Sequence, residues 1–189
     1  MRSDACNYRF HSDNLGDEVL DAGLTFTAYT ESLPGVGVER CRPLATESTL
    51  AREPWTDFTD VPAALNQPFT AFPRDYARLP VLSFVIPNLR DSTHSGSVAR
   101  GDHWLAAHIA GYATWARRHD SWLVITWDEA HHSSDNHIPT LITGAGIVAG
   151  TYSQPIDHYD LLRTIEVALG VPVIGGAAHA APISGVIAR

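Results

Sequence analysis

One stretch of this 189-residue chain decides the fold: Ser121-Trp122-Leu123-Val124-Ile125-Thr126-Trp127-Asp128-Glu129. Its first part is apolar and β-branched, which is typical of a buried parallel strand. It ends in two adjacent carboxylates, followed by His131 and His132. Ligands of open α/β sheets bind outside the carboxyl ends of the strands, so this pattern predicts a metal or phosphate site there. A strand that runs into a solvated acidic loop is the alternative.

Length and composition fit a single globular domain over residues 1–189. The hydrophobic fraction is 44% and the charged fraction is 18%, both ordinary values. The formal net charge of −8 argues against a general nucleic-acid or anionic-membrane binder. A local metal would still allow a phosphate-ester substrate. No apolar run reaches the roughly 20 residues of a membrane helix, and polar residues follow Met1, so we expect neither a transmembrane segment nor a signal peptide in this chain.

The two cysteines, Cys6 and Cys41, enclose a segment rich in glycine and proline. Neither belongs to a Cys-x-x-Cys pair, the spacing that is typical of zinc sites, so we do not expect these cysteines to bind zinc. Two unrelated buried thiols are one possibility. We favour a disulfide, which would place the protein in an oxidising compartment.

A second buried strand is predicted over residues 81–86, where Pro87 stops it. The apolar periodicity predicts a helix from about Asp102 to His119. Residues 81–127 should therefore form a strand–helix–strand unit with a right-handed crossover. Other patterns predict a short helix capped near Asn14, strands over 24–30 and 138–143, and a long helix capped by Asp157. The fold class is α/β, with a largely parallel sheet flanked by helices.

Residues 31–80 contain many prolines and resist assignment to regular elements. A segment of this length inside a compact domain is usually functional or holds short elements. Its aromatic residues should attach it to the rest of the domain.

Ligand-type residues follow two of the predicted strands, and another lies at the start of the last predicted helix. Carboxylates and imidazoles bind Zn, Mn or Fe, and a carboxylate-rich set favours Mg or Ca. Each residue has a structural alternative, because Asp91 could cap a turn and His94 could be solvated. A protonated histidine in a first helical turn opposes the helix dipole, which favours a functional role there. We expect five residues to meet in one cleft: Asp91, His94, Asp128, Glu129 and His158.

Several ordered motifs run along the chain: Phe84-Val85-Ile86-Pro87-Asn88-Leu89, Asp91, His94-x-Gly96, Gly101-Asp102-x-Trp104-Leu105, Thr126-Trp127-Asp128-Glu129, Asn136-x-Ile138-Pro139-Thr140 and His158-Tyr159-x-x-Leu162-Arg163-Thr164-Ile165-Glu166. With Tyr29-x-Glu31-Ser32 and the two cysteines, they resemble the bacterial phosphoesterase family of acid phosphatases and phospholipases C. That family belongs to the alkaline-phosphatase superfamily.

The resemblance implies an alkaline-phosphatase-like fold and a phosphoric ester hydrolase assisted by a divalent metal ion. Asp128, Glu129 and Asp91 match metal-binding positions, while His94 and His158 match catalytic positions near the phosphoryl group. The superfamily uses in-line attack by a serine or threonine, then hydrolysis of a phosphoenzyme. The implied substrate is a small phosphate ester or a phospholipid. The implied location is secreted or in the cell envelope, which agrees with a disulfide between Cys6 and Cys41.

The chain also departs from the family pattern. A strand ending in Glu-Asn and the nucleophile turn would lie upstream of Met1, so we expect an N-terminally incomplete fold with little activity by itself. Ala130-His131-His132 replace the usual carboxylates. The hydroxyls of Ser92, Thr93 and Ser97 remain, but the nucleophile is unknown. The alternatives are a non-catalytic degenerate domain that retains a weak metal- or phosphate-binding site, and a metal-dependent hydrolase of another ester class.

Overall fold

The computed structural model describes residues 8–38, 53–130 and 135–188. The chain divides into two compact units. Unit 1 comprises Met1–His103 and Asp157–Pro182, and unit 2 comprises Trp104–Ile156 and Ile183–Arg189. Each unit is described by itself. The predicted disulfide lies outside the described residues, because neither cysteine falls within them.

Unit 1 begins with helix α1, Leu15–Asp21, and strand β1, Phe26–Thr30. The Asn14 side chain accepts a hydrogen bond from the Asp17 backbone N–H at 3.0 Å, which caps the helix start. Gly23 follows the helix with a φ of 73°, a left-handed conformation that glycine adopts without strain. Both elements confirm the sequence prediction within two residues.

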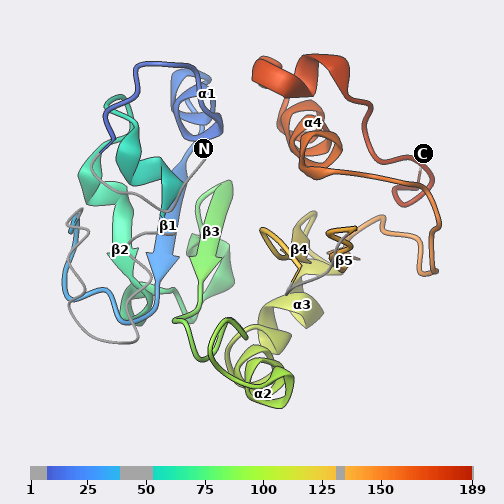
Figure 1. Cartoon of the computed structure of the whole chain (residues 1–189), viewed down its shortest axis with the longest axis horizontal. Coiled ribbons are helices and arrows are strands. Elements are labelled where there is room, and N and C mark those ends of the chain that lie inside the picture. The colour runs from blue at the N-terminus through green and yellow to red at the C-terminus, as the bar shows by residue number, and fades with distance from the viewer. Residues whose placement is uncertain (1–7, 39–52, 131–134, 189) are drawn as a thin grey trace. The chain divides into compact units, whose positions relative to one another are not determined.

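A three-stranded parallel sheet forms the centre of unit 1, in the order β2-β1-β3 (Figure 1). Strand β3 spans Leu82–Ile86 and pairs with the whole of β1. Strand β2, Asn66–Pro68, pairs only with the second half of β1. Because the strands are parallel, the ends of β1 and β3 lie at the same edge of the sheet.

The proline-rich segment before β3 holds short elements that the sequence did not resolve. They are 3₁₀ turns: η2 Pro54–Asp57, η3 Ala63–Leu65, η4 Phe69–Ala71 and η5 Tyr76–Arg78. Such turns need only one or two backbone hydrogen bonds, so frequent prolines do not exclude them. The expectation that aromatic residues attach this segment is confirmed, since Trp55 packs against Phe26 and Phe84.

The core of unit 1 lies between α1, β1 and the segment after the last helix. Its buried members are Val19, Phe26, Ala28, Trp55, Val61 and Val171. Full burial of one such side chain stabilises a fold by about 1.5–3 kcal/mol. The core therefore joins residues that lie more than 150 positions apart in sequence.

The last helix, α4, spans His158–Leu169, as predicted. Asp157 and Asp160 form a reciprocal capping box at its start. Gly170 ends the helix in a left-handed conformation with a φ of 67°. Among the described helices, none combines the length and the apolar character that a bilayer crossing needs.

The predicted helix over 102–119 forms as two helices. Helix α2 spans Val98–His108 and α3 spans Ala110–Ala116, with Ile109 between them at a φ of −118°. The backbone bonds from Ile109 to Leu105 and from Ala113 to Ile109 continue across the break. The interruption is therefore a local distortion at a buried β-branched residue, followed by the helix-weakening Gly111.

Unit 2 contains β4, Trp122–Thr126, and β5, Thr140–Gly144, which pair in an antiparallel two-stranded sheet. Antiparallel strands need no helical crossover between them. The parallel sheet and its helices confirm the α/β class, while the β4–β5 pair adds an antiparallel part. The crossover predicted from β3 to β4 joins residues of different units and stays a prediction.

Candidate functional site at the strand ends

Polar side chains gather where β1 and β3 end in unit 1. Glu31 directly follows β1, and Asn88 comes two residues after β3. The Asn88 backbone N–H donates a hydrogen bond to Glu31 Oε2 at 2.9 Å. This contact fixes the start of the loop that carries Asp91 and His94.

Asn88 shapes the loop that follows it. Its side-chain Oδ1 accepts hydrogen bonds from the backbone N–H groups of Arg90 and Asp91 at 2.9 and 3.0 Å. Its backbone carbonyl accepts the Ser92 N–H at 2.7 Å. Asparagine favours such turns because its short side chain imitates a backbone acceptor. With 5% of its surface exposed, Asn88 is a buried anchor for the loop.

Asp91 forms an ion pair with Arg100, which lies in the first turn of α2. Arg100 Nε donates to Asp91 Oδ1 at 2.6 Å, and Nη2 donates to Oδ2 at 3.4 Å. These hydrogen bonds hold the pKa of Asp91 below its usual value, although burial opposes the shift. The Glu31 carboxyl also faces Asp91. Asp91 is therefore a charged, buried carboxylate whose two oxygens both face a guanidinium.

His94 lies exposed in the same loop. The preceding residue, Thr93, has a φ of 71°, a strained conformation for a β-branched side chain. Ser95 ties the loop back through its backbone N–H, which donates to the Leu89 carbonyl at 2.8 Å. The structure thus places Asp91 and His94 in one tightly bonded loop at the carboxyl edge of the parallel sheet.

His158 is the first residue of α4 and is exposed. Its neighbour Asp157 accepts the backbone N–H groups of Tyr159 and Asp160 at 2.7 and 3.1 Å. This confirms Asp157 as a helix cap. The approach of His158 to the loop of Asp91 stays a prediction.

In unit 2, Asp128 and Glu129 follow β4 and are both exposed. Asn136 has a φ of 50°, and its Oδ1 accepts the Ala130 backbone N–H at 2.8 Å. This bond holds Ala130, the residue that directly follows the two carboxylates. His131 and His132 lie outside the described residues.

Two carboxylates in sequence supply the oxygen ligands that hard divalent cations prefer, so Asp128 and Glu129 fit such an ion. Asp91 fits it less well, because Arg100 already faces both of its oxygens. Across the described part of the chain, no group of three or more His, Cys, Asp and Glu side chains could hold a metal ion. The five predicted site residues belong to different units, so their convergence stays a prediction.

The sequence analysis missed three contributors to the site: Glu31, Asn88 and Arg100. Glu31 and Asn88 belong to the motifs on which the family resemblance rests, but neither was assigned a role there. Their positions just after two predicted parallel strands were the available signal, since such positions meet at one sheet edge. Arg100 carried no comparable signal.

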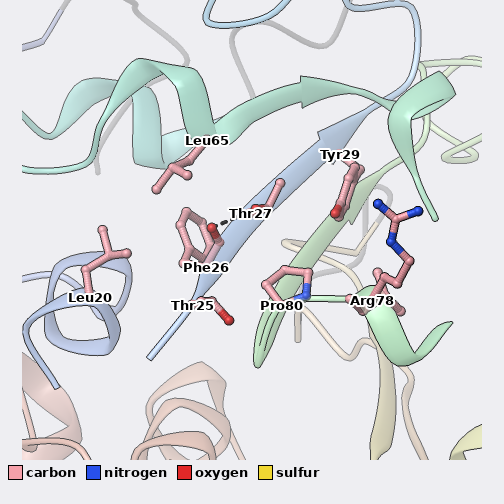
Figure 2. Close-up of a pocket in the computed structure, with 9 residues that line it drawn as sticks. Leu20, Thr25, Phe26, Thr27, Tyr29, Leu65, Arg78 and Pro80 are labelled. Carbon is pink, nitrogen blue, oxygen red and sulfur yellow. Dashed lines mark hydrogen bonds between the residues drawn. The ribbon is translucent and has the colours of Figure 1, made fainter. Parts of the chain in front are cut away.

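A hollow runs along β1 in the same sheet (Figure 2). Leu20, Phe26 and Leu65 lie toward one side of it, and Pro80 and Arg78 toward another. Its lining mixes apolar and polar side chains and extends from Thr25, before β1, to Tyr29, near the end of that strand.

The fold and the strand-end residues define an α/β protein with carboxylates presented at the ends of its strands. The chain belongs to the phosphoesterase family, which matches residues 3–172. It is 46% identical over 173 residues to a phosphatidylinositol-3-phosphatase of Mycobacterium tuberculosis, covering 90% of this chain and 57% of that protein. It is 27% identical over 115 residues to an acid phosphatase of Aspergillus fumigatus, covering 57% of this chain and 26% of that protein. No solved structure matches the chain.

Proposed function

We propose that the protein hydrolyses phosphoric esters with the help of a divalent metal ion. Membership of the phosphoesterase family is the observation that carries this proposal, and both relatives are named as phosphatases. The name of the mycobacterial relative supports a phospholipid or another small phosphate ester as the substrate. The chain spans 57% of the length of that relative, so the activity and the substrate are proposals for this protein.

In this proposal, Asp128 and Glu129 of unit 2 hold the metal through their carboxylate oxygens, and Asp91 of unit 1 is a further candidate ligand. When bound, the metal would neutralise charge on the phosphoryl group and activate the attacking oxygen. A metal ion at Asp91 would compete with Arg100 for the same oxygens. His94 and His158 would exchange protons with the attacking and leaving groups, the acid–base role that histidine takes most often in enzymes.

A secreted or cell-envelope location accompanies this proposal. It is supported by the family resemblance, and a bond between Cys6 and Cys41 would agree with it.

A second candidate is a non-catalytic domain with a weak metal or phosphate site. The observation that favours it is the ion pair between Arg100 and Asp91, which satisfies a proposed ligand without a metal. The two candidates differ in turnover and not in fold.

The test measures phosphate release from an aryl phosphate by the whole natural protein, with added divalent metals and with a chelator. Asp128→Asn keeps the shape of the side chain but removes its charge, so it should abolish metal-dependent turnover. His103→Gln serves as a control, because His103 is an exposed residue of α2 outside the proposed site. Metal binding without turnover by the unmodified protein would instead support the non-catalytic candidate.

A further inference from the structure

Glu53 is a carboxylic acid inside unit 1, only 2% exposed. It directly precedes η2 and faces two other buried polar residues, Thr30 at the end of β1 and Asn66 at the start of β2. Removing an ionised carboxylate from water costs several kcal/mol unless a cation or several donors compensate. The surroundings of Glu53 therefore decide which protonation state it adopts.

Among the described residues, the groups around Glu53 are uncharged and supply few hydrogen-bond donors. Asn66 Nδ2 donates to Glu53 Oε2 at 2.7 Å, and Trp55 Nε1 orients the amide by donating to Asn66 Oδ1 at 3.2 Å. The second oxygen, Oε1, and the Thr30 hydroxyl are buried without a completed hydrogen bond. Among the described residues, the groups that influence Glu53 from β1 and β2 are Thr30 and Asn66, both uncharged.

Burial raises the pKa of Glu53 to about 7, although Asn66 and Thr30 oppose the shift. Protonation would remove the buried charge and give Oε1 a proton. The neighbouring Thr30 hydroxyl can accept a hydrogen bond from that proton. Glu53 Oε1 and the Thr30 hydroxyl would then each gain a hydrogen-bond partner. When Glu53 is ionised, the Thr30 hydroxyl can turn to donate to it, but among the described residues no charged group offsets the buried carboxylate.

We propose that Glu53 is a proton-operated clamp, which in its neutral form hydrogen bonds to Thr30 and holds the end of β1 against η2 and β2. Thr30 immediately precedes Glu31, whose carboxylate holds the loop of Asp91 and His94 through Asn88. The protonation state of Glu53 therefore links the pH of the solution to how firmly the loop of the candidate site is held. It rests on the core of unit 1 and does not depend on the proposed function.

The direction of the pH effect follows from linkage. The pKa of Glu53 is higher in the folded chain, about 7, than its ordinary value of 4.5. The stabilisation from the neutral form is complete below the ordinary value and is lost as the pH rises through about 7. Unit 1 should therefore be more stable in weak acid than in weak base.

The experiment compares the intact chain with Glu53→Gln, because glutamine reproduces the neutral acid as a donor toward Thr30 and an acceptor from Asn66. Unfolding by urea is followed at about pH 5 and about pH 8, on either side of the expected titration. The two proteins should be similar at the lower pH. At the higher pH, the unfolding equilibrium constant of the unmodified chain should exceed that of Glu53→Gln by at least roughly tenfold.

Thr30→Val removes the acceptor while keeping the side-chain shape. Because Glu53→Gln keeps the hydrogen bond to Thr30, the two variants should be additive in a double-mutant cycle at the lower pH and coupled at the higher pH, where the unmodified chain carries the buried charge. Ser83→Ala is the matched control, since Ser83 on β3 also has a buried hydroxyl without a hydrogen bond. It should show no coupling to Glu53 at either pH.

A carboxyl-carbon NMR titration of the unmodified chain keeps the test independent of how the variants fold. It should show one glutamate titrating near neutral pH, whose signal disappears in Glu53→Gln. Titration of Glu53 in the ordinary acidic range would overturn the proposal. So would a Glu53→Gln variant that follows the unmodified chain at both pH values.

Discussion

Glu31 and Asn88, which lie 57 residues apart in sequence, are joined by a hydrogen bond of 2.9 Å from the Asn88 backbone N–H to the Glu31 carboxylate. The parallel pairing of β1 with β3 makes this contact possible, because it aligns Thr30 with Ile86 at the strand ends. Asn88 in turn holds Asp91 through its side chain. The geometry of the candidate site therefore depends on Glu31, which follows β1, although the loop itself follows β3.

Glu31→Ala should loosen this loop, because it leaves the Asn88 N–H without its acceptor. An unsatisfied buried group of this kind costs about 1–3 kcal/mol in the free energy of unfolding. Glu31→Gln keeps an acceptor oxygen and should cost less. Urea unfolding measures the cost, and amide hydrogen exchange at Asn88 locates it. Equal exchange at Asn88 in the alanine variant and the unmodified chain would refute the assigned contact.

Arg100→Gln should change the acid stability of unit 1. The pKa of Asp91 is lowered in the folded chain, so its stabilisation is present above the ordinary value and lost as the pH falls through the lowered one. Without Arg100, this loss should begin at a higher pH. The side chain of Arg100 is 49% exposed, so the effect should stay below about 1 kcal/mol and shrink in high salt. Acid unfolding curves at two salt concentrations measure it, and identical curves for both proteins would contradict the prediction.

The same variant tests whether Asp91 is a metal ligand. If a divalent cation binds there, Arg100 competes with it for both oxygens. We therefore expect Arg100→Gln to raise the affinity for the metal, measured by calorimetric titration. Arg118→Gln, which changes the charge equally in unit 2, should leave the affinity unchanged. An unaltered affinity in Arg100→Gln would remove Asp91 from the ligand set.

Gly96→Ala should disrupt the loop that carries His94. A Cβ at this position would collide with the backbone carbonyl of Arg90, which cannot rotate away as a side chain could. The expected cost is about 1–3 kcal/mol, as for other overpacked positions. Gly150→Ala is the control, because its Cβ would meet only ordinary contacts with Tyr152. Thermal unfolding of both variants compares them, and equal midpoints would show that the loop adapts.

The predicted helices and strands recur in the structure where local signals define them. Asn14, Asp157 and Gly170 act as caps, and capping depends on neighbours in sequence. Strand β2 was missed because it has three residues and a polar sequence, Asn66–Pro68. Asn66 in this strand is buried and forms hydrogen bonds with Glu53 and Trp55. A hydrophobic pattern in the sequence does not reveal contacts of this kind.

The sequence predicted the strands that precede the candidate residues: Asp91 and His94 follow β3, and Asp128 and Glu129 follow β4. The convergence of these residues in one site stays a prediction. The partners Glu31 and Arg100 depend on pairing and loop geometry, which become visible only in three dimensions. The antiparallel direction of β5 could not be predicted from the sequence either. The apolar pattern of residues 138–143 fits a strand in parallel or in antiparallel pairing.

The central claim is metal-assisted hydrolysis of a phosphate ester through Asp128 and Glu129. The most direct measurement is phosphate release from an aryl phosphate by the whole natural protein, before and after the metal is removed by a chelator and then restored. We expect turnover to be lost when the metal is removed, to return when the metal is restored, and to be absent in Asp128→Asn with or without the metal. Turnover by Asp128→Asn equal to that of the unmodified protein, or turnover that survives the chelator unchanged, would contradict it.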